Sequence, residues 1–130
     1  MREIKFRVWD TKSESMEYEI AIGKGYGEDS YILFLGLGET FIIDDDIVKI
    51  MQYTGFKDAI NKSEVYEHDI INFLGVGFLK VEWDYKDTGW ICLDKRYKKR
   101  SLVDVLLSGG IKVGNIYETP ELLENNKWKS

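Results

Sequence analysis

The sequence has 130 residues, which is the usual size of one domain. Apolar residues make up 44% of the chain and charged residues 32%, so the composition excludes a chain that is disordered throughout. The formal net charge of −5 excludes a surface that attracts polyanions over its whole extent.

Cysteine content and apolar runs bear on the compartment. Cys92 is the only cysteine, so no disulfide can form within the chain, and a reducing compartment fits. Residues 1–5 lack the apolar stretch of a signal peptide. The longest apolar run, 31–38, is far shorter than the ~20 residues that span a bilayer. We therefore expect a soluble, cytoplasmic protein that has no membrane partner.

Alternation of apolar and polar residues predicts strands in the first half of the chain. Residues 4–9 and 16–22 flank the polar turn 10–15, which is typical of a hairpin. Two short apolar runs around Gly36–Gly38 predict a further pair of strands. The stretch 47–53 fits a strand or a helical turn, of which we favour the strand. The expected strands are 4–9, 16–22, 31–35, 39–43 and 47–53.

The second half predicts strands and two short helices. The expected strands are 65–73, 78–84, 90–93 and 111–118. Ser101 followed by Asp104 resembles a capping box, and Gly109 supplies a stop, so one helix is expected between them. Thr119 before Pro120 predicts the start of a second helix, because proline suits the first helical turn.

These elements predict a mainly β fold. Short antiparallel strands are expected to form one or two small barrel-like lobes, with two short helical segments. We interpret 1–130 as a single domain. The polar segment 55–64 is its natural internal boundary, which gives lobes 1–58 and 64–123 and a tail at 124–130.

Four blocks of sequence point to a family. They read MREIKFRVWD, MQYTGFKD, EVYEHDIIN and GNIYETPELL, at 1–10, 51–58, 64–72 and 114–123. In this order they resemble the YopX family of phage and prophage proteins. The resemblance implies a mainly β fold and a phage or prophage origin, so the cytoplasm expected above is that of a bacterial host cell. It implies no activity, catalytic residue or cofactor.

The chain departs from the family pattern in one turn region. The family usually has glycine where His68 stands, between Glu67 and Asp69. The preceding loop usually carries an Asn-Gly-Lys turn, whereas this chain reads Ala-Ile-Asn-Lys-Ser at 59–63. Glycine adopts positive φ more readily than histidine, so the backbone at this position is of interest.

Acidic residues are the candidates for a metal site. The set comprises Asp44, Asp45, Asp46, Glu67, Asp69, Glu82 and Asp84. The aspartate run lacks the ligand spacing of an EF-hand, and a solvated acidic turn is the simpler interpretation. A metal-dependent hydrolase would need these carboxylates to converge, which the sequence leaves open.

Histidine and cysteine offer little further chemistry. In a strand, neighbouring side chains point to opposite faces, so His68 is not expected to converge with Glu67 and Asp69. We expect it to be a surface or turn histidine. Cys92 lies in an apolar strand and is expected to be packed and inert. No catalytic motif is found, so we expect no enzyme activity, no cofactor and no metal.

A basic run is the main functional signal. It consists of Lys95, Arg96, Lys98, Lys99 and Arg100, with Tyr97 inside it. Basic side chains beside an aromatic ring are typical of single-strand nucleic-acid binders. A solvated loop between a strand and a helix is the simpler interpretation. A third is docking to an acidic patch on a partner.

Tryptophan residues are candidates for a protein interface. Trp9, Trp90 and Trp128 are named because tryptophan is enriched at interface hot spots. The leading hypothesis is a non-enzymatic binding or assembly module that has an unknown protein partner or self-associates. The alternative hypothesis is a nucleic-acid-binding accessory protein that uses the basic run 95–100.

Overall fold

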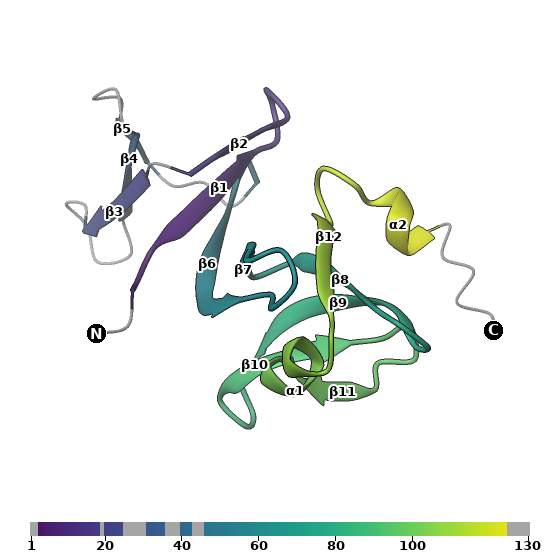
Figure 1. Cartoon of the computed structure of the whole chain (residues 1–130). Coiled ribbons are helices and arrows are strands. Elements are labelled where there is room, and N and C mark those ends of the chain that lie inside the picture. The colour runs from purple at the N-terminus through teal and green to yellow at the C-terminus, as the bar shows by residue number, and fades with distance from the viewer. Residues whose placement is uncertain (1–2, 19, 25–30, 36–39, 43–45, 125–130) are drawn as a thin grey trace. The chain divides into compact units, whose positions relative to one another are not determined.

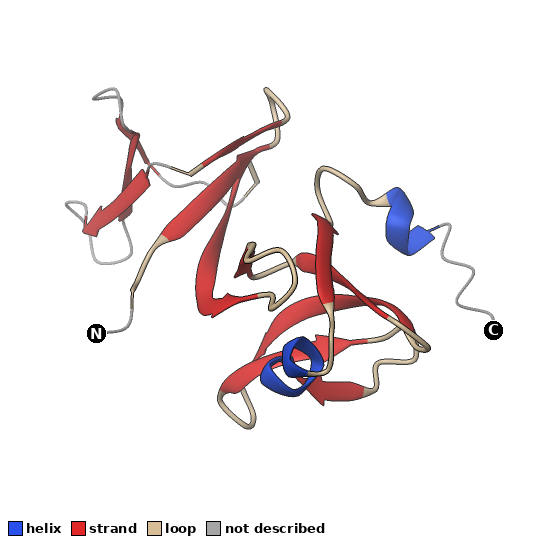
Figure 2. Cartoon of the chain, in the orientation of Figure 1, coloured by secondary structure: helices blue, strands red, loops and turns tan. Residues whose placement is uncertain are grey.

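The computed structural model describes residues 3–18, 20–24, 31–35, 40–42 and 46–124. Within them it has twelve strands, all paired antiparallel where a register is defined, and two short helices (Figures 1 and 2). The mainly β fold class with two helical segments is confirmed. The chain divides into two compact units, Met1–Tyr53 and Thr54–Ser130, directly before the polar segment in which the sequence placed a boundary.

The N-terminal unit is built on a hairpin. Strand β1 (Phe6–Asp10) pairs with β2 (Ser15–Glu17), so the expected hairpin is confirmed. The other edge of β1 pairs with the first half of β6 (Val48–Lys57). Val8 and Trp9 of β1 are buried in this unit, as is Met51 of β6. Because successive side chains of a strand point to opposite faces, the middle of β1 is buried on both faces.

A second sheet in the N-terminal unit corrects one prediction. Strands β3 (Ile20–Lys24), β4 (Tyr31–Leu35) and β5 (Thr40–Ile42) pair in that order. The stretch 16–22 was expected to be one strand, but β2 pairs with β1 whereas β3 pairs with β4. The alternation of residues predicts which face is buried, but it does not say with which neighbour a strand pairs.

The C-terminal unit contains a curled five-stranded sheet, in the order β11-β10-β9-β8-β12 (Figure 1). Its strands are β8 (Asp69–Phe73), β9 (Gly77–Asp84), β10 (Gly89–Leu93), β11 (Lys99–Ser101) and β12 (Ile111–Asn115). Leu79 and Val81, which alternate along β9, are fully buried, as is Ile71 of β8. They form one core with the buried residues of the first helix, which lies over the sheet.

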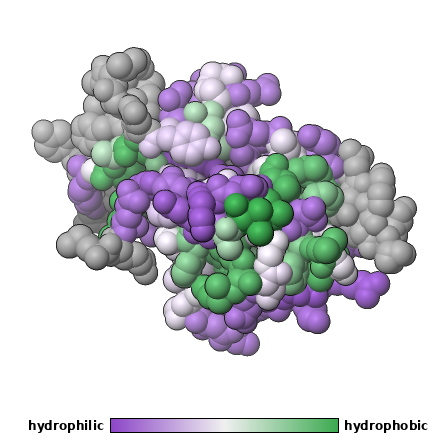
Figure 3. All heavy atoms as spheres, viewed as in Figure 1, coloured by the Kyte–Doolittle hydropathy of each residue, from purple (hydrophilic) through white to green (hydrophobic). Residues whose placement is uncertain are grey.

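The helices follow local sequence signals. Helix α1 (Leu102–Leu107) starts after Ser101, whose hydroxyl accepts a hydrogen bond from the Asp104 amide at 3.5 Å, so the expected cap is confirmed. Its Leu102, Val105 and Leu106 are buried, while Leu107 is exposed. Figure 3 shows hydrophobic atoms at the surface in the region of this helix. Helix α2 (Glu121–Glu124) follows Pro120.

The two described helices are not membrane spans. Both are short, and neither is long and apolar enough to cross a bilayer.

Candidate binding site

A turn rich in basic residues connects β10 to β11, and we call residues 94–99 the basic turn. Asp94 organises it, because one carboxylate oxygen, Oδ1, accepts hydrogen bonds from the amides of Arg96 at 2.8 Å and Lys98 at 3.0 Å. The amide of Tyr97 donates to the carbonyl of Asp94 at 2.9 Å. Tyr97 therefore has a φ of 61°, in the left-handed region that is uncommon for a non-glycine residue. The turn is a defined structure that aspartate side chains commonly make.

Two of the five basic residues of the run are neutralised by acidic neighbours. The guanidinium of Arg100 lies 3.1 Å from Asp94 Oδ2. The ammonium of Lys99 lies 3.0 Å from Asp84 Oδ2. The other three, which are Lys95, Arg96 and Lys98, are exposed and form no ion pair with any residue in the described part of the chain. The turn therefore presents three uncompensated positive charges.

The carboxylate that organises the turn stays ionised at neutral pH. Burial raises the pKa of Asp94, but the amides of Lys98 and Arg96 and the guanidinium of Arg100 outweigh it and hold the pKa below its ordinary range. The hydrogen bond from Lys99 likewise lowers the pKa of Asp84. The hydrogen bonds that shape the turn are therefore present under physiological conditions.

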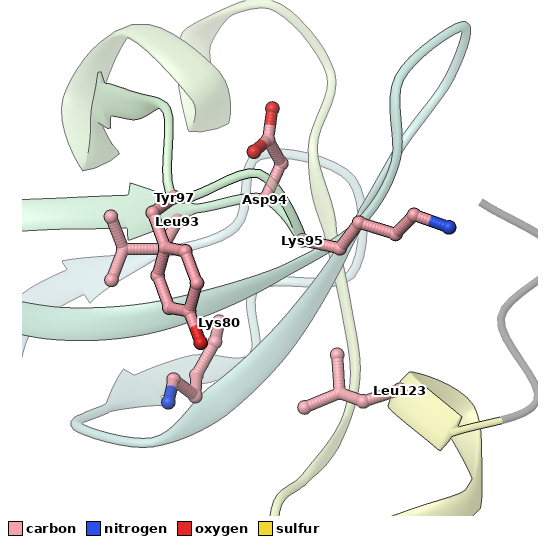
Figure 4. Close-up of a pocket in the computed structure, with 6 residues that line it drawn as sticks. All are labelled: Lys80, Leu93, Asp94, Lys95, Tyr97 and Leu123. Carbon is pink, nitrogen blue, oxygen red and sulfur yellow. The ribbon is translucent and has the colours of Figure 1, made fainter. Parts of the chain in front are cut away.

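A hollow of about 210 Å³ adjoins the basic turn (Figure 4). It is lined by Lys80 of β9, Leu93 of β10, Asp94, Lys95, Tyr97 and Leu123 of α2. In Figure 4 Tyr97 and Lys80 stand on one side and Leu123 on the other, with Lys95 along the rim. Sites for drug-sized ligands measure roughly 300–1,000 Å³, so this hollow suits a single planar group and no large cofactor.

The sequence predicted the basic part of this site but not its walls. Lys80 and Leu123 come from a central strand and from the last described helix. Nothing in their local sequence marks them, because only the tertiary fold brings them beside the basic turn. Lys80 also lies 3.6 Å from Glu82, so its charge is partly compensated.

His68 lies in a turn between β7 (Glu64–Tyr66) and β8, and one prediction about it is wrong. The stretch 65–73 was expected to be a single strand, in which Glu67 would point away from His68. In the turn both Glu67 and Glu82 approach the imidazole, with Oε2 atoms 3.9 and 3.3 Å from its Nε2. The expectation of a turn histidine holds.

The backbone of His68 has the conformation that glycine would adopt freely. Its φ is 69°. The turn is fixed by long-range hydrogen bonds, since the His68 amide donates to Val81 at 2.8 Å and its carbonyl accepts from Ile116 at 3.0 Å. These bonds hold the residue in the left-handed region although histidine adopts it at a cost.

The acidic candidates of the C-terminal unit have separate partners: Glu67 and Glu82 approach His68, whereas Asp69 and Asp84 each pair with a lysine. Asp69 is fully buried and accepts a hydrogen bond from the Tyr66 amide at 2.7 Å, while Lys112 Nζ lies 3.2 Å from it. Asp84 pairs with Lys99, as described above. In the described ranges, no group of three or more histidine, cysteine, aspartate or glutamate side chains could hold a metal ion. Asp44 and Asp45 lie outside the described residues.

The pKa values of Glu82 and Cys92 are shifted in opposite directions. Burial raises the pKa of Glu82, but the imidazole of His68 and the ammonium of Lys80 outweigh it, so the pKa lies below its ordinary value. Burial raises the pKa of Cys92 to about 12, despite the nearby Arg100. The thiol is therefore neutral at physiological pH, as an inert core cysteine would be.

The tryptophan residues named as interface candidates occupy different environments. Trp9 is buried in the N-terminal unit, with 9% of its surface exposed. Trp90 is partly buried against the core of the C-terminal unit and packs edge-on to Trp83, with ring centroids 5.0 Å apart. Trp128 lies outside the described residues.

Comparison with known proteins identifies the family. The sequence model of the YopX protein family matches residues 5–124. The chain belongs to the YopX family. The resemblance noted in the four sequence blocks is therefore confirmed for this YopX-family chain.

Two solved structures have the same fold as this YopX-family chain. Protein EF1440 from Enterococcus faecalis is 24% identical, with a TM-score of 0.61, and the match covers 95% of this chain and 99% of that one. Protein yopX from Bacillus subtilis is 18% identical, with a TM-score of 0.59, covering 95% and 97%. At these identities the likeness shows the fold alone. A comparison with curated proteins gave no match.

Proposed function

We propose that this YopX-family chain is a non-enzymatic binding module whose recognition surface is the basic turn and the adjoining hollow. One observation carries the proposal: a turn built by Asp94 presents Tyr97 with 77% of its surface exposed, between cations that no described carboxylate neutralises. A rigid aromatic side chain flanked by positive charge is a common way to recognise an anionic partner.

The remaining polar groups support a binding role over catalysis. A catalytic nucleophile or base needs a free, activated group within reach of substrate. The Cys92 thiol is buried and neutral, and Asp69 is buried against Lys112. His68 is held between Glu67 and Glu82. Each of these groups already has a structural role within the fold.

The proposed partner is anionic. The family resemblance implies a phage or prophage origin, in which case the partner belongs to the phage or to its bacterial host. Self-association and a role for the tryptophan residues remain predictions, because the contacts described here favour neither.

Capture of partners from a host lysate tests the proposal. The test variant carries Lys95→Glu, Arg96→Glu and Lys98→Glu, which reverses the three uncompensated charges. Bound material is compared by mass spectrometry and by staining for nucleic acid. We expect partners that bind the native chain to be lost from the test variant, because its surface repels anions.

A charge-matched control separates the surface from the total charge. Lys12, Lys57 and Lys62 are exposed lysines far from the basic turn in sequence, and replacing all three by glutamate changes the net charge equally. This control should retain the partners. Equal capture by the native chain and the test variant, with both folded by circular dichroism, would refute the proposal.

A further inference from the structure

We infer that the basic turn and its hollow bind single-stranded nucleic acid, with one base stacked on the ring of Tyr97. The inference rests on the proposed function, and it names the class of partner. Three features of the site carry it: the presentation of the ring, the walls of the hollow and the number of free cations.

The ring of Tyr97 is held ready for stacking. Its backbone is in the left-handed region, and the residues on either side are fixed through their amides to the carboxylate of Asp94. The exposed fraction of 77% leaves the ring open to a ligand. Because the turn is already ordered, binding does not have to order the backbone. An exposed aromatic ring is the platform on which single-strand binders stack bases.

The hollow provides apolar walls and hydrogen-bond donors around a base that is stacked on Tyr97. Leu93 and Leu123 supply apolar walls, and the amines of Lys80 and Lys95 lie at the edges (Figure 4). The volume of about 210 Å³ suits one planar ring system. A base inside a duplex is stacked between its neighbours and cannot enter without being extruded, which costs energy. The site therefore favours single strands over duplexes.

The free cations fit the phosphates that flank such a base. Lys95 and Arg96 precede Tyr97 and Lys98 follows it, so all three exposed cations are carried within two residues of the ring-bearing residue. An acidic peptide would also satisfy these cations, but it brings no planar group for the ring and the hollow. The combination of ring, hollow and cations therefore favours nucleic acid.

The rest of the chain limits how much nucleic acid is bound. The chain has 23 acidic residues against 18 basic ones. Neighbouring carboxylates such as Asp84 and Asp87 lie next to the turn and would repel phosphates beyond the site. The footprint is therefore short. With three phosphate contacts, the logarithm of affinity should fall with the logarithm of salt concentration with a slope of about −2 for single strands.

Fluorescence anisotropy with a short labelled oligothymidylate tests the inference. A labelled duplex and a polyglutamate peptide are the comparison ligands. We expect the single strand to bind best. Tyr97→Ala should weaken its binding about fivefold or more, whereas Tyr97→Trp should retain it, because stacking depends on an aromatic ring. Reversing the charges of Lys95, Arg96 and Lys98 should abolish binding and its salt dependence.

The outcomes distinguish the inference from the proposed function. Equal affinity of Tyr97→Ala and the native chain for the oligonucleotide would refute the stacking site. Preference for the peptide, or nuclease-resistant partners that still depend on the basic turn, would overturn the nucleic-acid class while the binding module stands. If no ligand and no captured partner depends on the turn, both proposals fail.

Discussion

Replacing Gly114 with alanine tests how β12 is joined to the turn that follows it. A Cβ atom at this position would overlap Thr119 Oγ1 and lie 3.2 Å from a methyl carbon of Leu122. The same oxygen accepts a hydrogen bond from the Asn115 amide at 3.0 Å and donates one to the Asn115 carbonyl at 3.0 Å. The threonine side chain must therefore rotate away if alanine is to be admitted.

The cost can be worked from these contacts. Loss of two hydrogen bonds contributes about 2 kcal/mol, since each contributes roughly 1 kcal/mol. Crowding against Leu122 and the displaced side chain adds about 1–3 kcal/mol. Alanine restricts the unfolded chain more than glycine does, which returns about 0.4–1 kcal/mol. The net expectation for Gly114→Ala is a free energy of unfolding lower by about 2–5 kcal/mol.

Urea denaturation followed by tryptophan fluorescence measures this change. The matched control is Gly89→Ala, because a Cβ atom there meets nothing within 4 Å and its φ is not in the left-handed region. We expect the control to unfold within about 0.5 kcal/mol of the native chain. Equal midpoints for Gly114→Ala and Gly89→Ala would refute the packing argument.

A double variant checks that Thr119 is the obstacle. With Thr119→Ala already in place, the hydroxyl that Gly114→Ala displaces is gone, so the second substitution should cost about 1–3 kcal/mol less than in the native background. Additive effects of the two substitutions would mean that the strain arises elsewhere.

Three other predictions concern the polar groups of the C-terminal unit. Lys112→Met should lower the free energy of unfolding by about 3 kcal/mol in a denaturant titration, because the fully buried Asp69 loses its cation. The control is Lys86→Met, which replaces an exposed lysine and should change the free energy of unfolding by no more than about 0.5 kcal/mol in the same titration. His68→Gly should be more stable than His68→Ala by about 1 kcal/mol, because the positive φ at this position is unfavourable for alanine but not for glycine. Equal thermal melting temperatures of the two variants would show that the turn relaxes. The pKa of Glu82 lies below its ordinary value of 4.5, so its stabilising contribution is complete above that pH and is lost as the pH falls through the lower folded pKa. Glu82→Gln should therefore flatten the acid limb of a stability-against-pH curve, and an unchanged limb would contradict the pairing with His68.

Local signals in the sequence were enough for much of the fold. Ser101 and Asp104 predict the start of α1, because the cap is made within four residues. The hairpin of β1 and β2 follows from alternation around a polar turn, which is also a local property. Both predictions depend only on residues that are close in the chain, and both are confirmed.

Predictions that depend on distant partners were less complete. The turn at His68 is set by backbone bonds to Val81 and Ile116, so the local pattern, which continues the alternation, could not reveal it. Thr119 was expected to cap α2, but its hydroxyl bonds to both the amide and the carbonyl of Asn115. Long-range backbone bonds decide the conformation at His68, whereas the hydroxyl of Thr119 is taken up by Asn115, four residues earlier in the chain.

The candidate site shows the same division. The positive charge of the basic turn is visible in the sequence. Which cations remain free is decided by Asp84, which lies on β9 and takes up Lys99, and by the turn that brings Asp94 to Arg100. The hollow also needs Leu123 of α2. The sequence therefore reveals which charged residues belong to the site, whereas its geometry depends on residues that only the fold brings together.

The buried Cys92 makes the folded chain unreactive toward thiol reagents. At a pKa of about 12 and with no exposed surface, the sulfur should react with maleimide only when the C-terminal unit opens. The rate at which Cys92 is modified therefore reports how often this core opens. Because Cys92 is the only cysteine, a second one placed on the surface could be labelled alone while the protein stays folded. A fluorophore could in this way be attached near the basic turn without removing any native residue from the core.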